Sequence, residues 1–230
     1  STLFRCMLGL LKRYKGSITV NDKDIRQMGT REMARNIAYI PQTTYPPFNY
    51  SIFEMVLMGT ASQASMFSGP GKRQAELVDD ALEKMGIAHL KHRGFNQISG
   101  GERQLALIAR ALAQDARILI LDEPTANLDF GNQIRVLSQL KLLAGEGYTI
   151  VQSTHNPDQA FLFSDRVLAL KDGKIFACGT PNDIYSESLL KALYGVDAEV
   201  LNLYDGKVRV SIPKVVIGKD FSSEGGPQNL

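Results

Sequence analysis

The sequence contains few cysteines, no long hydrophobic run and almost no excess of charge of either sign. Cys6 and Cys178, its two cysteines, lie far apart and form no Cys-x-x-Cys pair. This excludes a disulfide framework and a cysteine-based metal site, and it favours a reducing, cytoplasmic setting. Lys and Arg total 26 against 24 Asp and Glu, a formal net charge of +2. No basic surface therefore argues for nucleic-acid binding.

Polar residues also interrupt the most apolar region, at Arg110, Gln114, Asp115 and Arg117. No window approaches the roughly 18 to 20 apolar residues that a membrane-spanning helix requires. The chain is therefore not expected to cross a bilayer, although it can dock on a protein that does. Its 230 residues, 44% of them hydrophobic, suffice for one substantial domain with an appended piece.

Hydrophobic periodicity predicts helices alternating with strands over most of the chain. We expect a helix from Ser1 towards Gly16, further helices over 31–36, 51–57, 74–85, 105–113 and 132–143, and strands over 16–22, 37–42, 118–121 and 149–154. The apolar run 118–121 is typical of a buried strand in a parallel sheet. The predicted fold class is therefore α/β, with a strand-free helical insertion over about 51–110.

The last third of the sequence changes character. Asp172-Gly173 and Asp205-Gly206 each separate two alternating runs, a strong signal for β-hairpins. Thr180-Pro181 starts a short helix between them. Residues 219–230 are expected to be disordered.

Two adjacent carboxylates, Asp122 and Glu123, follow the predicted buried strand 118–121. The carboxyl ends of parallel strands are where α/β folds bind ligands. There Asp122 is suited to hold Mg²⁺, and Glu123 to orient or deprotonate water. Taken alone, such a pair is more commonly the start of a solvated loop.

Two further motifs are suited to phosphate. Ser99-Gly100-Gly101 offers unobstructed backbone amides at the start of a helix, although an isolated SGG is more often a flexible turn. His155 follows the strand 149–154, where its imidazole could donate to a γ-phosphate oxygen; a lone His there is usually structural. His89 and His92 have no third ligand nearby, which favours a solvated helix end over a metal site.

In this order and spacing, the motifs resemble those of the ATP-binding cassette (ABC) ATPases, from Ser1 to about Ile184. The resemblance implies a P-loop NTPase (RecA-like) parallel sheet and a Mg²⁺-dependent ATPase. It makes 98–102 the signature motif, 118–122 the Walker B strand, 126–129 the D-loop, Gln42 the Q-loop glutamine and His155 the switch histidine. Glu102 and Ile98 stand where the family commonly has Gln and Leu.

The resemblance also implies a set of site residues. The implied catalytic residues are Glu123, His155 and Gln42. The implied nucleotide-binding residues are Ser1, Thr2, Ser99, Gly100, Gly101, Glu102 and Asp129. The implied Mg²⁺ ligands are Ser1, Gln42 and Asp122.

The glycines and lysine of the family's G-x-x-x-x-G-K-[ST] loop are not in the sequence. We therefore interpret the chain as N-terminally truncated, and expect the printed fragment alone to be inactive. The expected domains are 1–184, an ABC ATPase domain lacking its N-terminal strands and P-loop, and 185–230, an extension with a hairpin.

About 56 residues separate Gln42 from Ser99, with no heptads, and only one cassette is present. This differs from the DNA-repair relatives, which insert long coiled coils, and from the translation-type relatives, which carry two cassettes. The segments 179–185 and 194–213 resemble importer ATPases for ferric siderophores, haem and cobalamin. We therefore expect an ATP-hydrolysing subunit that powers import of such a metal chelate.

The expected partners are a second cassette in an ATP-bound homodimer, integral membrane permease subunits and, indirectly, a substrate-binding protein, with no nucleic acid. The expected location is the cytoplasmic face of the cell membrane. The alternatives are a non-catalytic cassette fragment that only binds partners, and the ATPase of another ABC transporter class.

Overall fold

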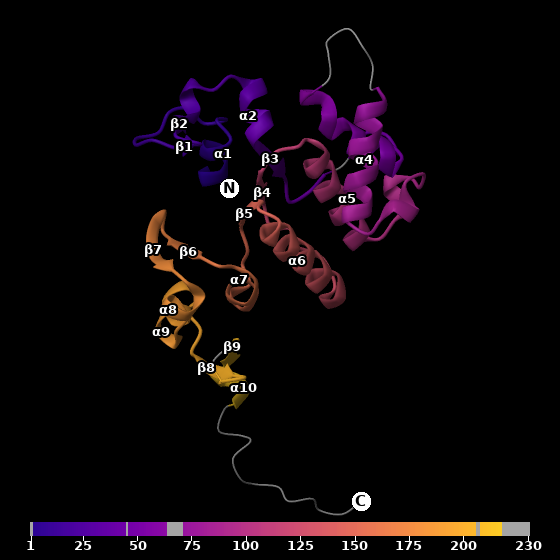
Figure 1. Ribbon diagram of the computed structural model, residues 1–230. Helices are drawn as coiled ribbons and strands as arrows, with labels where there is room; N and C mark the ends of the chain where they lie inside the picture. The colour runs from indigo at the N-terminus through magenta and orange to yellow at the C-terminus, as the bar shows by residue number, and fades with distance from the viewer. Residues whose placement is uncertain (1, 45, 64–70, 206–207, 218–230) are drawn as a thin grey trace, which may run out of the picture. The chain divides into compact units, whose positions relative to one another are not determined.

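The computed structural model describes residues 2–44, 46–63, 71–205 and 208–217. Ser1 and the predicted disordered segment 219–230 lie outside these residues. The chain forms two compact units, Ser1–Ser153 and Thr154–Leu230, whose elements are labelled in Figure 1. The predicted domain division after Ile184 stays a prediction.

A parallel sheet lies at the centre of the first unit. Its strands are β3 (Ile37–Ile40), β4 (Ile118–Leu121) and β5 (Thr149–Gln152), in the order β3-β4-β5. Leu121 pairs with Ile40 on one side and Gln152 on the other, so the three strands end level with one another. The predicted parallel sheet is confirmed.

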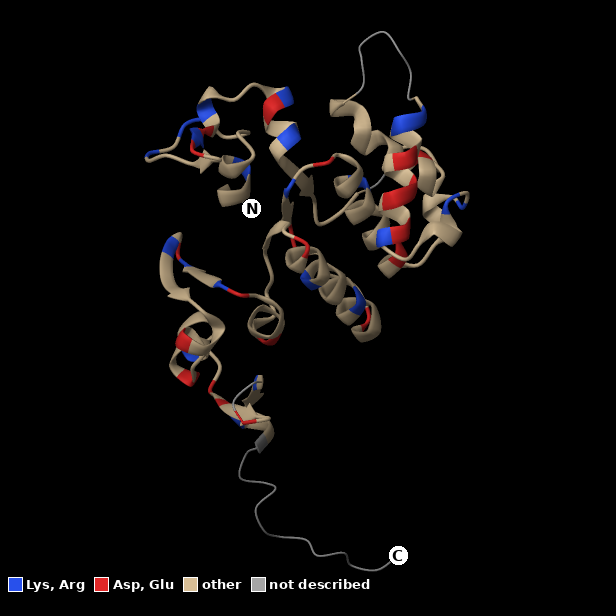
Figure 2. Cartoon of the chain, in the orientation of Figure 1, with Lys and Arg blue, Asp and Glu red and all other residues tan. Residues whose placement is uncertain are grey.

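Helices between β3 and β4 form the main hydrophobic core. They are α3 (Ile52–Leu57), η2 (Met58–Ser62), α4 (Lys72–Lys84), η3 (Ala88–Leu90), η4 (Phe95–Gln97) and α5 (Gly100–Ala113), and no strand is assigned to the described part of this region. Apolar residues of α3, α4 and α5 pack in one cluster with β4. Acidic residues lie along α4 (Figure 2), opposite its buried Val78, Ala81 and Leu82.

The predicted capping box at the start of α3 is present. The backbone N–H of Ser51 donates to Oε2 of Glu54 at 2.7 Å, and the N–H of Glu54 donates to the Ser51 hydroxyl at 3.2 Å. Two N–H groups that lack intrahelical acceptors are thereby satisfied. The helix after β4, α6 (Phe130–Gly145), buries Val136, Leu140 and Leu143 in the same core.

The first helix is shorter than predicted. Helix α1 spans Thr2–Met7, and Gly9 then adopts a positive φ of +67°. The N–H of Leu10 donates to the carbonyl oxygen of Arg5 at 2.9 Å. A left-handed glycine of this kind ends a helix at little steric cost, so the apolar spacing beyond Met7 does not continue the helix.

The single strand predicted over 16–22 is a small hairpin instead. Strands β1 (Thr19–Val20) and β2 (Lys23–Asp24) pair antiparallel, with Asn21 at φ 49° and Asp22 at φ 62° in the turn. Asn and Asp tolerate the two left-handed positions that such a turn requires. The chain continues through η1 (Ile25–Gln27) and α2 (Thr30–Asn36) to β3.

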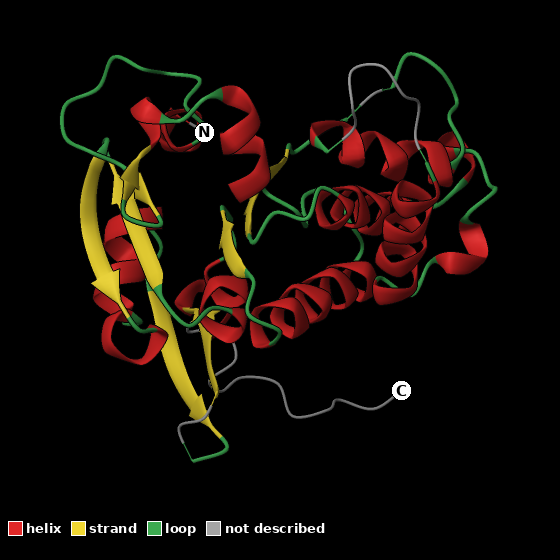
Figure 3. Cartoon of the chain, turned by 45° about the horizontal axis from the view of Figure 1, so that its top comes forward, coloured by secondary structure: helices red, strands yellow, loops and turns green. Residues whose placement is uncertain are grey.

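The second unit contains both predicted hairpins, drawn as paired yellow strands in Figure 3. They are β6 (Val167–Lys171) with β7 (Lys174–Gly179), and β8 (Ala198–Leu203) with β9 (Val208–Pro213). The remaining elements are α7 (Pro157–Phe163), α8 (Pro181–Ile184), α9 (Glu187–Tyr194) and α10 (Lys214–Ile217). Among the described residues, no helix is both long enough and apolar enough to span a membrane.

Candidate functional site

Three polar residues follow the strands of the parallel sheet at its carboxyl edge: Gln42 after β3, Asp122 after β4 and Ser153 after β5. The Ser153 hydroxyl donates to Oδ1 of Asp122 at 2.7 Å and accepts from the N–H of Glu123 at 3.0 Å. One hydroxyl therefore ties the ends of β4 and β5 together and holds both predicted carboxylate residues.

Glu123 is bound at its side chain as well. Nε2 of Gln42 donates to Oε2 of Glu123 at 2.7 Å, so the structure brings these two predicted catalytic residues together. Glu123 also has a φ of 49°, which is uncommon for a residue with a Cβ and often marks functional sites. The Gln42 amide thus orients a carboxylate whose backbone is already held by Ser153.

Tyr39 reaches this edge from β3. Its hydroxyl donates to Oδ2 of Asp122 at 3.4 Å. Burial, and then the negative charge of Asp122, raise the pKa of Tyr39, so the phenol stays a donor at neutral pH. Sequence reasoning missed both Tyr39 and Ser153. Their strand positions could have identified them, since each lies beside the end of β4 once the register is known.

The predicted signature residues begin α5. Ser99 is the N-cap: its side chain accepts from the N–H of Glu102 at 3.3 Å, and its own N–H donates to Oε2 of Glu102 at 2.8 Å. The Ser99 N–H and hydroxyl lower the pKa of Glu102, so its carboxylate is charged at neutral pH. The first N–H groups of a helix, here those of Gly100 and Gly101, lack intrahelical acceptors and point outward.

Gly101 also meets the start of α6. A Cβ at Gly101 would lie 2.1 Å from Oδ1 of Asn132. Asn132 in turn binds both carboxylate oxygens of Asp129, through its N–H at 2.9 Å and its Nδ2 at 2.7 Å. The predicted signature and D-loop residues are therefore neighbours, joined by Asn132. Bonds from Asn132 also lower the pKa of Asp129.

The other predicted residues lie elsewhere. Thr2 is the exposed first residue of α1, while Ser1 is outside the described residues. His155 is exposed and belongs to the second unit, directly before Asn156, the N-cap of α7.

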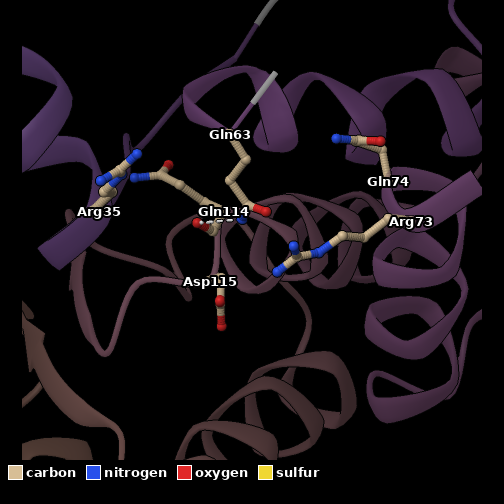
Figure 4. Close-up of a pocket in the computed structure, with 6 residues that line it drawn as sticks. All are labelled: Arg35, Gln63, Arg73, Gln74, Gln114 and Asp115. Carbon is tan, nitrogen blue, oxygen red and sulfur yellow. Dashed lines mark hydrogen bonds between the residues drawn. The ribbon is translucent and has the colours of Figure 1, made fainter. Parts of the chain in front are cut away.

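A polar pocket of about 360 Å³ lies in the first unit, apart from these residues. Figure 4 shows its lining residues, which are Arg35, Gln63, Arg73, Gln74, Gln114 and Asp115. None of the predicted site residues is among them.

The described groups suit a nucleotide with a divalent cation. Adjacent carboxylates at a sheet edge offer the oxygen ligands that Mg²⁺ prefers, and the α5 amides suit phosphate oxygens. Among the described residues, no group of three or more His, Cys, Asp or Glu side chains could hold a metal.

Comparisons with known proteins address the family directly. Residues 1–126 match the family model described as "ABC transporter". An uncharacterized ABC transporter ATP-binding protein of Haemophilus influenzae is 39% identical, over 88% of this chain and 77% of that protein. The iron(3+)-hydroxamate import ATP-binding protein FhuC of Bacillus subtilis is 34% identical, over 87% of this chain and 75% of the relative.

Solved structures agree with the sequence matches. An ABC transporter provisionally described as metal-chelate type, solved in an inward-facing conformation, matches with a TM-score of 0.81 and 30% identity, covering 94% of this chain and 83% of that one. The structure of cbiO1 from Clostridium perfringens, part of the ABC transporter complex cbiONQ, matches with a TM-score of 0.70 and 28% identity. The match covers 84% of this chain and 79% of that one. The predicted family and P-loop NTPase fold class are confirmed, and the chain belongs to the ATP-binding ATPase subunits of ABC transporters.

Proposed function

We propose that this ATPase powers the import of a metal chelate, such as a ferric siderophore, haem or cobalamin. Support comes from the names of its relatives. They include a probable iron chelatin transport ATP-binding protein of Helicobacter pylori, 37% identical, and the ferric enterobactin transport protein FepC of Escherichia coli, 34% identical. A cobalamin import protein, BtuD of Halobacterium salinarum, is also 34% identical.

The bond between Gln42 and Glu123 is the observation that carries the catalytic proposal. Glu123 is the general base that orients and deprotonates the attacking water, and its carboxylate must therefore face one direction. Nε2 of Gln42 holds Oε2 of Glu123 at 2.7 Å, which fixes the direction of the carboxylate. The same bond uses only the donor of the Gln42 amide, whose acceptor, Oε1, lies on the other branch of the side chain.

Oxygen atoms of Asp122, Gln42 and Ser1 are the proposed Mg²⁺ ligands. Mg²⁺ would neutralise charge that develops on the phosphates. Asp122 already accepts bonds from Ser153 and Tyr39, which orient its carboxylate and leave lone pairs for a cation. His155 donates to the γ-phosphate. Thr2, Glu102 and Asp129 contribute to the nucleotide site, Glu102 by fixing the start of α5.

The site is completed by a second copy of the chain. Ser99 and the amides of Gly100 and Gly101 lie at the start of α5, where they bind the phosphates of the ATP that the partner cassette holds. The homodimer closes on ATP and opens after hydrolysis. This cycle drives integral membrane permease subunits, which receive the chelate from a substrate-binding protein and hold the ATPase at the cytoplasmic face of the membrane.

Proteoliposomes that contain the complete transporter test this function. Vesicles loaded with ATP should take up a radiolabelled ferric siderophore, haem or cobalamin when the matching binding protein is present. A sugar or amino acid offered in the same way is the control and should not enter. Uptake of the control alone would contradict the proposed substrate class, and hydrolysis without uptake of any chelate would contradict import.

A further inference from the structure

His155 directly precedes the start of α7. The N-cap of this helix is Asn156, whose Oδ1 accepts from the N–H of Gln159 at 3.1 Å. Because His155 and the N-cap are consecutive, the backbone of His155 can move only as far as the start of α7 allows. The anchoring of α7 therefore bears on the imidazole position.

Asp158, in the first turn of α7, joins this helix to the C-terminal hairpin. Its Oδ1 accepts three hydrogen bonds: from the Tyr185 hydroxyl, from the Ser211 N–H at 3.1 Å and from the Ser211 hydroxyl at 3.0 Å. Ser211 lies within β9, opposite Val200 of β8. Its N–H is thus satisfied by a carboxylate on α7.

Packing fixes the same face of α7 one turn later. The Phe161 ring stacks on the Tyr185 ring, with centroids 3.8 Å apart and an interplanar angle of 21°. Tyr185 is only 4% exposed and belongs to a cluster with Leu190 and Ala198. Residues three apart share one helix face, so Asp158 and Phe161 together hold α7 at a defined rotation.

We propose that Asp158 is a positioning residue for His155, and that the hairpin β8–β9 holds it in place through Ser211, with Tyr185 as the second donor. The proposal rests on the proposed function of His155 at the γ-phosphate. It gives the C-terminal hairpin a role in hydrolysis, since loss of its contact with Asp158 would free the start of α7. Asp158 itself touches no substrate.

Steady-state hydrolysis by the complete transporter is the first test. Asp158→Ala removes the acceptor and should lower kcat about tenfold, because a displacement of about 1 Å at a reacting group can cost up to about 10²-fold. The KM for ATP should change by less than about twofold, since most nucleotide contacts lie elsewhere. Asp158→Asn keeps an Oδ1 acceptor and should recover most of the rate.

Glu187→Gln is the matched control. It removes an exposed ion pair in the same unit, between Glu187 and Lys214 at 3.1 Å, without touching α7. Its kcat should equal that of the unchanged protein. If Asp158→Ala and Glu187→Gln lowered kcat equally, the loss would come from lower stability of the protein, and the proposal would be overturned.

A spectroscopic readout separates positioning from stability. The sequence has three histidines, at positions 89, 92 and 155, so their labelled imidazole resonances can be assigned by substitution. Asp158→Ala should shift the resonance of His155 and leave those of His89 and His92 in place. An unchanged His155 resonance would overturn the proposal even if the rate fell.

A double substitution distinguishes this proposal from the one on which it rests. In single-turnover reactions, adding Asp158→Ala to His155→Ala should cause no further loss of rate. Additive losses would show that Asp158 acts independently of His155. If His155→Ala alone hydrolyses ATP at the normal rate, the γ-phosphate role fails, while the resonance of His155 still tests its dependence on Asp158.

Discussion

Gln42 and Glu123, 81 residues apart in the chain, are joined by a hydrogen bond of 2.7 Å between Nε2 and Oε2. The bond links the loop after β3 to the loop after β4. In the proposed function, the first of these loops carries a Mg²⁺ ligand and the second carries the general base. A displacement of Gln42 would therefore release the carboxylate of Glu123.

Glu123→Gln should keep ATP binding and lose roughly 10² to 10⁴ in turnover, equivalent to about 3 to 5 kcal/mol, because an amide cannot accept the proton of water. The ATP-bound homodimer should then persist and elute as a dimer in gel filtration. Glu146→Gln is the control, since its carboxylate pairs with Lys84 and follows the C-terminal end of α6, whereas the site lies at the carboxyl ends of the strands. Turnover near normal in Glu123→Gln would remove Glu123 from the base role.

Ser153→Ala should lower both stability and turnover. The substitution deprives Asp122 of a donor and the Glu123 N–H of its acceptor, and an unsatisfied polar group costs about 1 to 3 kcal/mol. Thermal melts and ATPase rates measure the two effects. Ser62→Ala is a matched control because the Ser62 hydroxyl has no hydrogen-bond partner among the described residues. If the two variants have the same melting temperature, Ser153 is not the bridge that its hydrogen bonds indicate.

Gly101→Ala should destabilise the protein by about 1 to 3 kcal/mol, the usual cost of overpacking, because its Cβ would lie 2.1 Å from Oδ1 of Asn132. The cost should be visible in urea unfolding. Gly145→Ala, at the end of α6, meets nothing within 4 Å and should be neutral or slightly stabilising. A Gly101→Ala protein as stable as the parent would show that Asn132 moves aside freely.

Acid should weaken the start of α3. The Ser51 hydroxyl, and then the Ser51 N–H, lower the pKa of Glu54 from its ordinary value of 4.5. A carboxyl with a depressed pKa in the folded state stabilises the protein above its unfolded pKa, and this contribution is lost as the pH falls through the folded pKa. The melting temperature of the parent should therefore exceed that of Glu54→Gln above about pH 5 and converge with it towards about pH 3. A difference independent of pH would contradict this assignment.

Local signals predicted most of the elements but not the contacts between them. Asp172-Gly173 predicted a hairpin because its turn chemistry is contained in adjacent residues, and Ser51 with Glu54 predicted a helix start for the same reason. Gly9 ended α1 early, although the apolar spacing continued beyond it, because a glycine in the left-handed conformation favours termination.

Longer-range contacts could not be predicted from local patterns in the sequence. The roles of Ser153 and Tyr39 depend on strand register, and the contact of Gly101 with Asn132 depends on how α5 packs on α6. The link between Asp158 and Ser211 spans 53 residues, and no local pattern encodes it. For the site, the residue types near Asp122 could be predicted from the motifs, whereas the bonds that orient them required the fold.

The left-handed backbone of Glu123 sets stability and activity against each other at one position. Holding a residue other than glycine in such a conformation costs on the order of 1 kcal/mol or more, and Glu123→Gly would relieve that cost. Selection for heat resistance alone would therefore favour discarding the side chain that is the proposed general base. Any effort to evolve a hardier form of this ATPase should keep position 123 under a separate requirement for turnover.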